Sequence, residues 1–444
     1  MNEKWKGFAC FVQNLHPVRL VALGYLSYVT VGWVLLALPF CHAPGVVSSL
    51  DALFTAASAV STTGLSTVST GNAFNIPGQV LVLILIQLGG IGYMTFGSFV
   101  VLSRSAVLSE CRQKIGKAVF SMPEDFRIDK FVRSVITFTL ITEVVGAGAL
   151  YLAFSQAGIR HPAWSAVFHS VSAFCTAGFS LYDDSFERLR GNVPVNLILG
   201  ILSYLGAIGF IVFVDGWRRL IGKTHRVTLT SRIILVTTVW LSLGAILLFF
   251  VAEPTIQDLP PDERLMAAFF QVMTSITTVG FNTIPIGMLS QASLLLIILL
   301  MIIGASPAGT GGGLKTTTFT ALFGVIRSAI LGREKVQFWN KEIPEERIRV
   351  AIASLGLYAG SLILGCYLLA LTESLPSTSL LFEAASALGT VGLSTGITAQ
   401  LTPMGKLILI TLMFIGRLGP LAFGIALFFP KASADEPGRE DLAI

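Results

Sequence analysis

FTAASAVSTTGLS at residues 54–66 is the first of four stretches that align without gaps, the others being FHSVSAFCTAGFS at 168–180, FQVMTSITTVGFN at 270–282 and FEAASALGTVGLS at 382–394. All four share a Phe, a small hydroxyl residue, a Thr and a Gly at the same relative positions. The shared glycines are Gly64, Gly178, Gly280 and Gly392. Self-similarity at a nearly constant interval is the signature of a chain built from repeats. The sequence therefore predicts four related units.

Long apolar runs flank every stretch. The runs before the stretches cover residues 20–38, 131–154, 233–251 and 348–371, and those after them cover 79–102, 193–214, 292–326 with an interruption, and 405–428. A second landmark lies in each later run: LGGIG at 88–92, LGAIG at 205–209, IGASP at 303–307 and IGRLG at 415–419. Each unit is therefore predicted to be a helix, a short helix with a loop, and a second helix.

The composition requires a membrane. The 444 residues are 53% hydrophobic and only 12% charged, with a mean hydropathy of +0.77, whereas soluble domains carry about 25% charged residues. No charge occurs from Leu20 to Leu50 or from Ala52 to Ser103, which exceeds two spans of about 20 residues each. The N-terminal sequence MNEKWKGF does not resemble a cleavable signal peptide, so we expect the first span to be retained.

The short central helices are expected to be re-entrant. About ten helical positions cannot cross a hydrocarbon layer about 30 Å thick, and non-helical backbone at that depth survives only where it lines a cavity or is buried in protein. The prediction is an all-α polytopic membrane protein with eight transmembrane helices and four re-entrant pore helices in pseudo-fourfold symmetry. The units are expected at residues 1–103, 104–217, 218–330 and 331–444.

Basic residues indicate the orientation. The net charge is +5 and the pI about 9.0, and most of the excess lies in the N-terminal segment, in residues 104–133, 215–232 and 325–349, and in the tail. Cytoplasmic segments of membrane proteins carry such an excess, so both termini are expected in the cytoplasm and no nucleic-acid partner is required. The basic segments could also contact a cytoplasmic partner, and a simple topology signal explains them equally well.

The Thr-X-Gly turns suit a dehydrated cation. Backbone carbonyls can replace its water ligands, Thr adds a hydroxyl oxygen, Gly reaches positive φ without a steric cost, and the C-terminal end of a short helix adds negative potential. The candidate filter residues are Thr62, Thr63, Gly64, Thr176, Ala177, Gly178, Thr278, Val279, Gly280, Thr390, Val391 and Gly392. A single such motif would more often be a helix-packing device, but four copies between pairs of spans favour a pore.

These motifs resemble the membrane subunit of the Ktr, Trk and HKT superfamily of K⁺ transporters, most closely the KtrB type, over nearly the whole chain. The resemblance implies four M1-P-M2 repeats with one filter glycine each, K⁺ as the transported ion, and a location in the inner (plasma) membrane. It also implies a homodimer on a cytoplasmic ring of nucleotide-binding, RCK-type regulatory subunits. The four loops differ from one another, so we expect weaker discrimination against Na⁺ than in tetrameric K⁺ channels.

A gate is predicted in the third unit, where ASPAGTGGGLKTTTF at 305–319 interrupts the second apolar run. Glycine costs a helix about 1 kcal/mol and proline about 3. The string is not a phosphate-binding P-loop, because Leu314 stands where that motif needs glycine. The superfamily has an intramembrane loop here, which implies gate residues Gly309, Thr310, Gly311, Gly312, Gly313 and Lys315. Arg417 is added because a charge at membrane depth is costly and usually functional. It could anchor the carbonyl groups of the loop or repel cations while the gate is closed; the alternative is an arginine that snorkels to the cytoplasmic surface.

Three further residues carry open alternatives. Glu143 and Glu383 either take part in proton or Na⁺ coupling or serve as hydrogen-bonding structural groups, and His169 is expected to be structural. At the level of function, the alternative to a gated K⁺ pore is a Na⁺-coupled or Na⁺-permeable transporter of the same fold. An enzyme is not expected, because no cluster of His, Cys, Asp and Glu has ligand or catalytic spacing, and no covalent cofactor is implied.

Overall fold

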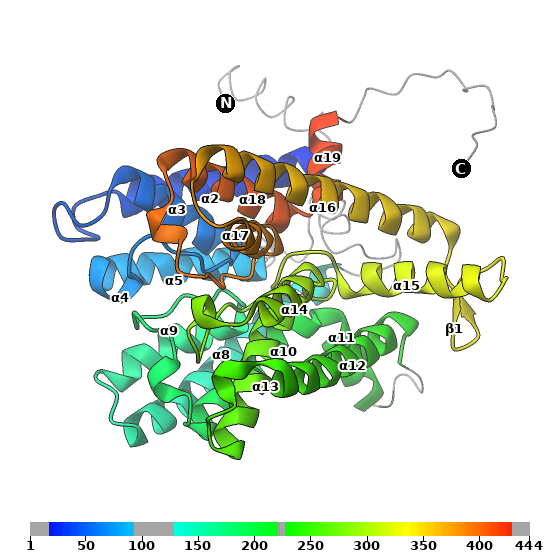
Figure 1. Cartoon of the computed structure of the whole chain (residues 1–444), viewed down its shortest axis with the longest axis horizontal. Helices are drawn as coiled ribbons and strands as arrows, with labels where there is room; N and C mark the ends of the chain where they lie inside the picture. The colour runs from blue at the N-terminus through cyan, green and yellow to red at the C-terminus, as the bar shows by residue number, and fades with distance from the viewer. Residues whose placement is uncertain (1–16, 93–127, 221, 223–226, 429–444) are drawn as a thin grey trace.

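The computed structural model describes residues 17–92, 128–220, 222 and 227–428, which are mostly helical (Figure 1). The basic tail and most of the basic stretch at 104–133 lie outside these residues. The helices are described below in four groups of three, which we call units one to four along the chain. The main helices are α2 (Pro17–Leu36), α3 (Ser49–Ser61) and α5 (Ile76–Ile91) in unit one; α8 (Ile128–Gln156), α9 (Pro162–Phe174) and α10 (Val193–Ile208) in unit two; α12 (Leu229–Ala252), α13 (Pro261–Thr277) and α14 (Gln291–Ile302) in unit three; and α16 (Glu345–Thr372), α17 (Ser377–Gly389) and α18 (Pro403–Leu418) in unit four.

Shorter elements connect and extend these helices. They are α4 (Thr70–Ala73), η1 (Glu187–Leu189), α11 (Phe210–Leu220), η2 (Pro254–Ile256), η3 (Ile286–Met288), α15 (Thr316–Ile330), β1 (Gln337–Phe338), β2 (Lys341–Glu342), η4 (Thr398–Gln400) and α19 (Pro420–Phe428). The two-stranded hairpin is a small exception to the all-α prediction. It turns on Trp339 and Asn340, both at positive φ, and Trp339 packs against the Arg232 guanidinium, 4.2 Å from the ring centre.

The long first helices face lipid and the short helices do not. Among the described residues four helices are long and apolar enough to cross a membrane, Val18–Leu36, Val132–Gln156, Leu229–Ala252 and Glu345–Thr372, or up to six spans if each bent pair counts as one. Apolar side chains such as Val144, Trp240 and Leu371 are well exposed on them. Large exposed apolar surface marks a face covered by another apolar phase. The chain is therefore a multi-pass membrane protein, while the count of eight spans stays a prediction.

The second helices end earlier than predicted. The run at 193–214 was expected to be one helix, but α10 and α11 meet at 92°, and α18 and α19, within the run at 405–428, meet at 100°. Gly209 and Gly419 adopt φ of 91° and 87° at these corners, a conformation that ends a right-handed helix. The single-helix prediction is therefore wrong for both runs. In unit three the predicted break is confirmed, because α14 ends at Ile302 and α15 begins at Thr316.

The units follow one another around a closed circle. The second helix of each unit packs against the short helix of the next, which pairs α5 with α9, α10 with α13, α14 with α17, and α18 with α3. Figure 1 shows the consequence for the two ends of the chain: the blue helices of unit one and the orange helices of unit four lie side by side. The short helices are the buried centre of this circle, since their phenylalanines Phe54, Phe168, Phe270 and Phe382 are fully buried.

The first glycine of three landmarks lets a second helix touch a short helix. A Cβ atom on Gly89, Gly206 or Gly416 would collide with a backbone carbonyl near the end of the short helix of the same unit, namely Val60 O, Phe174 O or Leu388 O. In unit three Gly304 instead faces Gly312 O. Backbone cannot move aside as a flexible side chain can, so these glycines fix the distance between helices.

We therefore expect Gly416→Ala to destabilise the protein by about 1–3 kcal/mol, the usual cost of overpacking. The matched control is Gly360→Ala in α16, where a Cβ atom would meet nothing and the better helix propensity of alanine should be neutral or stabilising. Thermal unfolding of both purified variants in detergent measures the difference. Equal melting temperatures for Gly416→Ala and the wild type would contradict the packing argument.

Candidate functional site

Each short helix ends in the same unusual turn. Thr62, Thr176, Thr278 and Thr390 have φ between 49° and 58°, the left-handed region that disfavours a β-branched residue. The next backbone N–H closes the turn on the carbonyl of the small hydroxyl residue: Thr63 on Ser58 (2.9 Å), Ala177 on Ser172 (2.8 Å), Val279 on Thr274 (3.1 Å) and Val391 on Ser386 (2.9 Å). This is the bond of a Schellman helix end, where glycine is the usual residue. The four Thr-X-Gly turns thus share one backbone conformation.

The four turns form a closed ring. Each shared glycine has a positive φ, from 66° at Gly178 to 93° at Gly392, as expected from the sequence. A Cβ atom on each would collide with the carbonyl oxygen before the glycine of the next unit: Gly64 with Ala177 O, Gly178 with Val279 O, Gly280 with Val391 O, and Gly392 with Thr63 O. The sequence of contacts returns to unit one, so the structure brings all twelve predicted filter residues together around one axis.

Side-chain hydroxyls support the ring from behind. The N–H of Gly64 donates to Ser58 Oγ at 3.1 Å, and the N–H of Gly392 donates to Ser386 Oγ at 3.0 Å. In unit two the bond differs, because Ser172 Oγ donates to Phe179 O at 2.9 Å. Thr274 Oγ1 in unit three is buried with no hydrogen-bond partner among the described residues. The four units therefore share a backbone geometry but not a set of supporting bonds.

The glycine-rich segment of unit three, residues 303–315, closes one side of the ring; we call it the inner loop. Thr62 Oγ1 lies 3.3 Å from Thr310 O, Thr176 Oγ1 lies 3.0 Å from Thr310 Oγ1, and the N–H of Gly312 donates to Thr390 Oγ1 at 2.8 Å. Thr278 Oγ1 lies where a Cβ atom on Gly311 would have to go. All four ring threonines therefore meet three consecutive residues of the inner loop.

Two basic side chains hold the inner loop. Arg417 donates to Thr310 O, Thr62 Oγ1 and Gly89 O, and Lys315 Nζ donates to Gly311 O at 2.8 Å. The guanidinium thus contacts the loop and the ring, which fits the anchoring interpretation of Arg417 and not the snorkelling one. The gate candidates Gly309 and Gly313 lie in the same loop, on either side of residues 310–312.

The C-terminal end of helix α10 provides a further anchor for the inner loop. The backbone N–H groups of Ser306 and Thr310 donate to Ala207 O at 3.0 Å and Gly206 O at 3.1 Å. These carbonyls belong to the last turn of α10, where no backbone N–H group of the helix donates to them. Because the helix ends at Gly209, these carbonyl groups are free to accept hydrogen bonds from the inner loop.

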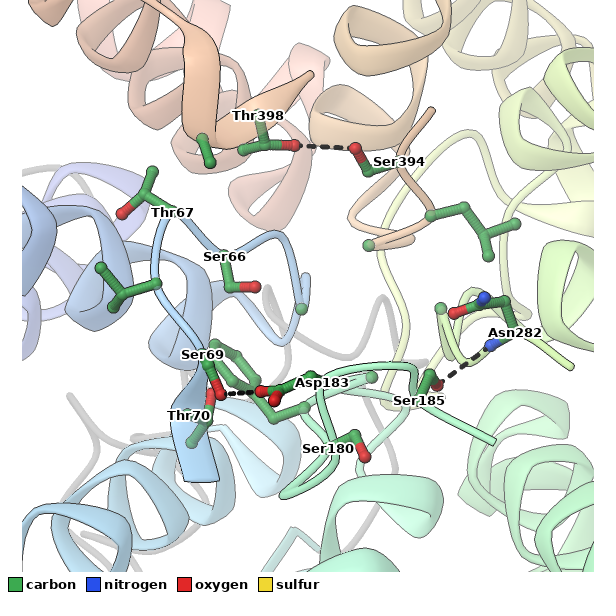
Figure 2. A pocket seen from close by; sticks show the side chains of 18 of the residues that line it. Ser66, Thr67, Ser69, Thr70, Ser180, Asp183, Ser185, Asn282, Ser394 and Thr398 are labelled. Atoms are coloured by element: carbon green, nitrogen blue, oxygen red, sulfur yellow. Dashed lines mark hydrogen bonds between the residues drawn. The ribbon is translucent and has the colours of Figure 1, made fainter. Parts of the chain in front are cut away.

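The opposite side of the ring opens into a cavity of about 480 Å³. Its floor contains the four shared glycines and its walls carry hydroxyl and amide groups (Figure 2). The labelled polar residues are Ser66, Thr67, Ser69, Thr70, Ser180, Asp183, Ser185, Asn282, Ser394 and Thr398. Asp183 is the only charged residue that lines it in the described part of the chain, and it accepts bonds from Ser69 and Asn72 of unit one. The cavity is polar but almost uncharged.

The wall of unit one is fixed by a charged pair that the sequence analysis missed. Asp51 accepts bonds from Ser48 Oγ at 2.6 Å and Thr67 Oγ1 at 2.7 Å, and pairs with Lys406 Nζ of unit four at 3.0 Å. Asp51 lies outside the candidate spans. Partial burial acts to raise its pKa, but these hydrogen bonds and the Lys406 charge outweigh burial and lower the pKa to about 2.

Glu143 and His169 are buried and do not line the cavity. Glu143 accepts a bond from Gln87 Nε2 at 3.1 Å, and Cys175 Sγ lies 3.7 Å from its other oxygen. His169 Nδ1 lies 2.8 Å from Ser165 O, and its ring stacks on Tyr182. These contacts fit the structural interpretation of both residues. Involvement of Glu143 in coupling stays a hypothesis.

Apolar helices surround a ring of backbone turns, with a polar cavity on one side of the ring and the inner loop on the other. This arrangement defines a membrane protein of the channel or transporter class. Comparisons with known proteins specify the family. Residues 37–434 match the TrkH family, described as cation transport proteins, and the chain belongs to this family.

Relatives of similar length support the assignment. The chain is 34% identical over 418 residues to Ktr system potassium uptake protein B of Vibrio alginolyticus, which covers 93% of this chain and 91% of that protein. It is also 34% identical over 434 residues to potassium/sodium uptake protein NtpJ of Enterococcus hirae, with 95% of each covered. The crystal structure of the potassium transporter TrkH from Vibrio parahaemolyticus has the same fold, with a TM-score of 0.72 over 92% of this chain and 84% of that one at 22% identity. These relatives are named as transport proteins, in agreement with the expectation that the chain is not an enzyme.

Asp51→Asn should weaken the link between units one and four. Loss of hydrogen bonds to a charged group costs about 1.5–3 kcal/mol each. Because the folded pKa of Asp51 is lowered, its contribution to stability is complete above the unfolded value near 3.9 and is lost only as the pH falls towards 2. The stability difference from the wild type should therefore stay constant between about pH 5 and pH 8.

Thermal unfolding across that range measures the effect. The control is Asp184→Asn, which removes only the pair with the well-exposed Arg188 and should change stability little. A difference for Asp51→Asn that disappears between pH 6 and pH 5 would show that the carboxylate is not held ionised as described.

Proposed function

We propose that the chain is the K⁺-translocating subunit of an uptake system, with the ring of Thr-X-Gly turns as its selectivity filter. The observation that carries the proposal is the closed sequence of glycine-to-carbonyl contacts, from Gly64 through Gly178 and Gly280 to Gly392 and back. Such contacts are possible only if four backbone segments surround one axis. The names of the potassium uptake relatives supply the ion.

The chemistry of the ring suits a monovalent cation. Carbonyl groups and threonine hydroxyls offer oxygen ligands without a full negative charge, so a bound ion is stabilised but can leave. The four short helices end at the ring, and the negative ends of their dipoles favour cations over anions. The cavity concentrates no fixed positive charge in its described lining, so cations can reach the ring from that side.

The inner loop is proposed as the gate. It contacts all four ring threonines, so an ion leaving the ring on that side meets the loop. Its glycines allow another backbone path, and the bonds from Arg417 and Lys315 stabilise the closed position. Opening requires these bonds to be exchanged for others.

The assembly and topology are proposals that rest on the resemblance and the charge pattern. We propose four M1-P-M2 repeats at 1–103, 104–217, 218–330 and 331–444, which together contribute eight transmembrane and four pore helices. The termini would lie in the cytoplasm and the chain in the inner (plasma) membrane. A homodimer would bind a ring of nucleotide-binding, RCK-type regulatory subunits, as the word system in the names of the Ktr relatives suggests.

A Na⁺-coupled or Na⁺-permeable transporter is the second candidate. It is favoured by the similarity to NtpJ, which is named a potassium/sodium uptake protein. The mutual differences among the four turns also favour it, because unequal oxygen ligands discriminate less strictly between ions.

Ion flux into liposomes separates the two candidates. K⁺ uptake that exceeds Na⁺ uptake at equal gradients is expected for the K⁺ pore, whereas equal fluxes would overturn K⁺ selectivity. Gly280→Ala should reduce K⁺ flux at least about tenfold, because a Cβ atom there would collide with Val391 O at a positive φ. The control Gly148→Ala, whose Cβ atom would meet nothing, should conduct as the wild type does.

Deletion of Gly309 to Gly313 should raise flux several-fold, because it removes the segment that contacts the ring threonines. Lys315→Met is the milder variant; it removes the bond to Gly311 O and should raise flux by a smaller factor. The same liposome assay measures both. Unchanged flux in both folded variants would exclude the inner loop as the gate.

A further inference from the structure

Glu383 is a fully buried carboxylate on α17, immediately after Phe382. Its oxygens accept bonds from Ser394 Oγ at 2.5 Å, from the Thr395 N–H at 3.1 Å and from Thr398 Oγ1 at 2.8 Å. No described basic side chain forms an ion pair with it. A carboxylate buried in this way is stable only if hydrogen bonds replace its water. All three donors belong to the segment that follows Gly392, residues 393–399, which we call the outer segment of unit four.

The outer segment lies between Glu383 and the ring. Ser394 and Thr398 line the cavity beside Gly392 and bond to each other at 2.9 Å (Figure 2). On the other side Gly392 is held by Ser386 Oγ. Gly392 is therefore fixed from two directions by the same short helix, directly through Ser386 and through the outer segment by Glu383.

The equivalent position in units two and three makes an equivalent contact with different chemistry. His169 Nε2 in unit two accepts the Leu181 N–H at 3.2 Å, and Gln271 Nε2 in unit three donates to Thr283 Oγ1 at 3.2 Å. Thr55 in unit one has an unpaired hydroxyl among the described residues, and Asp51 binds Thr67 instead. We call the residues that follow the ring glycine in each unit its outer segment. A contact that recurs from one helix position indicates that these outer segments must be held in place.

We propose that Glu383 is a positioning residue that fixes the outer segment of unit four and thereby sets the preference of the ring for K⁺ over Na⁺. The proposal rests on the proposed function. K⁺ and Na⁺ differ in the distance at which carbonyl oxygens coordinate them best, so a displaced or more mobile carbonyl alters their relative binding. A carboxylate offers acceptors to all three donors. A glutamine has the same shape but is uncharged and has one acceptor oxygen. The Thr398 hydroxyl must therefore turn to accept from the NH₂ group, and the bonds from Ser394 and Thr395 lose the strength that a charged acceptor gives them.

Glu383→Gln tests the proposal against a matched control, Glu373→Gln. Glu373 is also a largely buried carboxylate of unit four, and it accepts bonds from the Thr402 N–H and Thr402 Oγ1. Its donor Thr402 does not line the cavity, whereas Ser394 and Thr398 do, so the loss of the Glu373 carboxylate should affect stability alone. We expect Glu383→Gln to lower the K⁺/Na⁺ flux ratio in liposomes about tenfold, the effect of losing a hydrogen bond to a charged group, and Glu373→Gln to leave the ratio unchanged.

Thr398→Val provides a second variant that keeps the carboxylate and removes one donor, should Glu383→Gln fail to fold. It should lower the same ratio by a smaller factor. Folded Glu383→Gln and Thr398→Val proteins with wild-type flux ratios would overturn the proposal, as would an equal fall in Glu373→Gln.

Hydrogen exchange separates this proposal from the proposed function. The amides of Thr395 and Gly396 should exchange faster in Glu383→Gln than in the wild type, and Glu373→Gln should leave them unchanged. Unaltered exchange in Glu383→Gln would overturn the positioning role whatever the fluxes are. Wild-type liposomes without K⁺ uptake would instead overturn the proposed function, and with it the role of Glu383 in ion preference.

Discussion

The contact between each ring glycine and the carbonyl group of the next unit is the constraint on which the rest of the structure depends. Because the contact is backbone against backbone, no rotamer change could make room for a side chain at Gly64 or its three equivalents. The positive φ of these glycines removes the remaining freedom. The other positions of the four turns can differ as long as this contact is kept, and they do: the residue before the glycine is Thr63, Ala177, Val279 or Val391.

The threonines two positions before these glycines, at positive φ, add a second constraint. A left-handed conformation costs a β-branched residue about 1–2 kcal/mol, and glycine would avoid this cost at a Schellman helix end. The structure shows what the threonine side chain does in return: Thr62, Thr176 and Thr390 each bond to the inner loop. Backbone strain is therefore retained where a hydroxyl group is needed at the ring.

This geometry also explains why, in the described part of the chain, unit three alone carries a long loop between the two parts of its second helix. The four threonine hydroxyls converge on residues 310–312, and Gly311 and Gly312 have no room for a Cβ atom beside Thr278 and Thr390. A second segment of the same kind could not fit beneath the ring. The position of Ala305, near the start of this loop, is held in the other units by Gly90, Ala207 or Arg417. Arg417 extends from its position to the inner loop of unit three. The four units therefore differ in sequence here because the space at the ring axis admits only one such loop.

Much of this architecture could be predicted from the sequence, because it depends on local patterns. The repeated motif located the ring, the glycine at its centre predicted the positive φ, and the run of glycine and proline located the break between α14 and α15. The bends at Gly209 and Gly419 could not be predicted in the same way, since glycine in an apolar run is equally typical of close helix packing. Only the contacts of the inner loop with α10 explain the bend at Gly209.

The pair of Asp51 and Lys406 illustrates the other limit. Asp51 is the lone charge between two long uncharged runs, a visible signal for a buried partner. The partner, however, lies at the far end of the chain, and only the closure of the circle brings units one and four together. Contacts that follow from closure cannot be derived from one unit. The outer segments show the same limit, because their supports are two carboxylates, an imidazole and an amide, namely Asp51, Glu383, His169 and Gln271, and Asp51 stands at a different helix position from the others.

The diversity of these supports has a consequence for the ion path. The ring is nearly symmetric in its backbone, but each outer segment is held by a different group, so the walls of the cavity differ in stiffness and polarity. From the same helix position, Glu383 accepts hydrogen bonds from three donors in unit four, whereas Gln271 donates one hydrogen bond in unit three, where Ser185 and Glu187 of unit two also bind Asn282. Ion preference set by backbone carbonyls depends on how firmly each is held. Selectivity in such a ring is therefore a property of the four supports as well as of the four glycines.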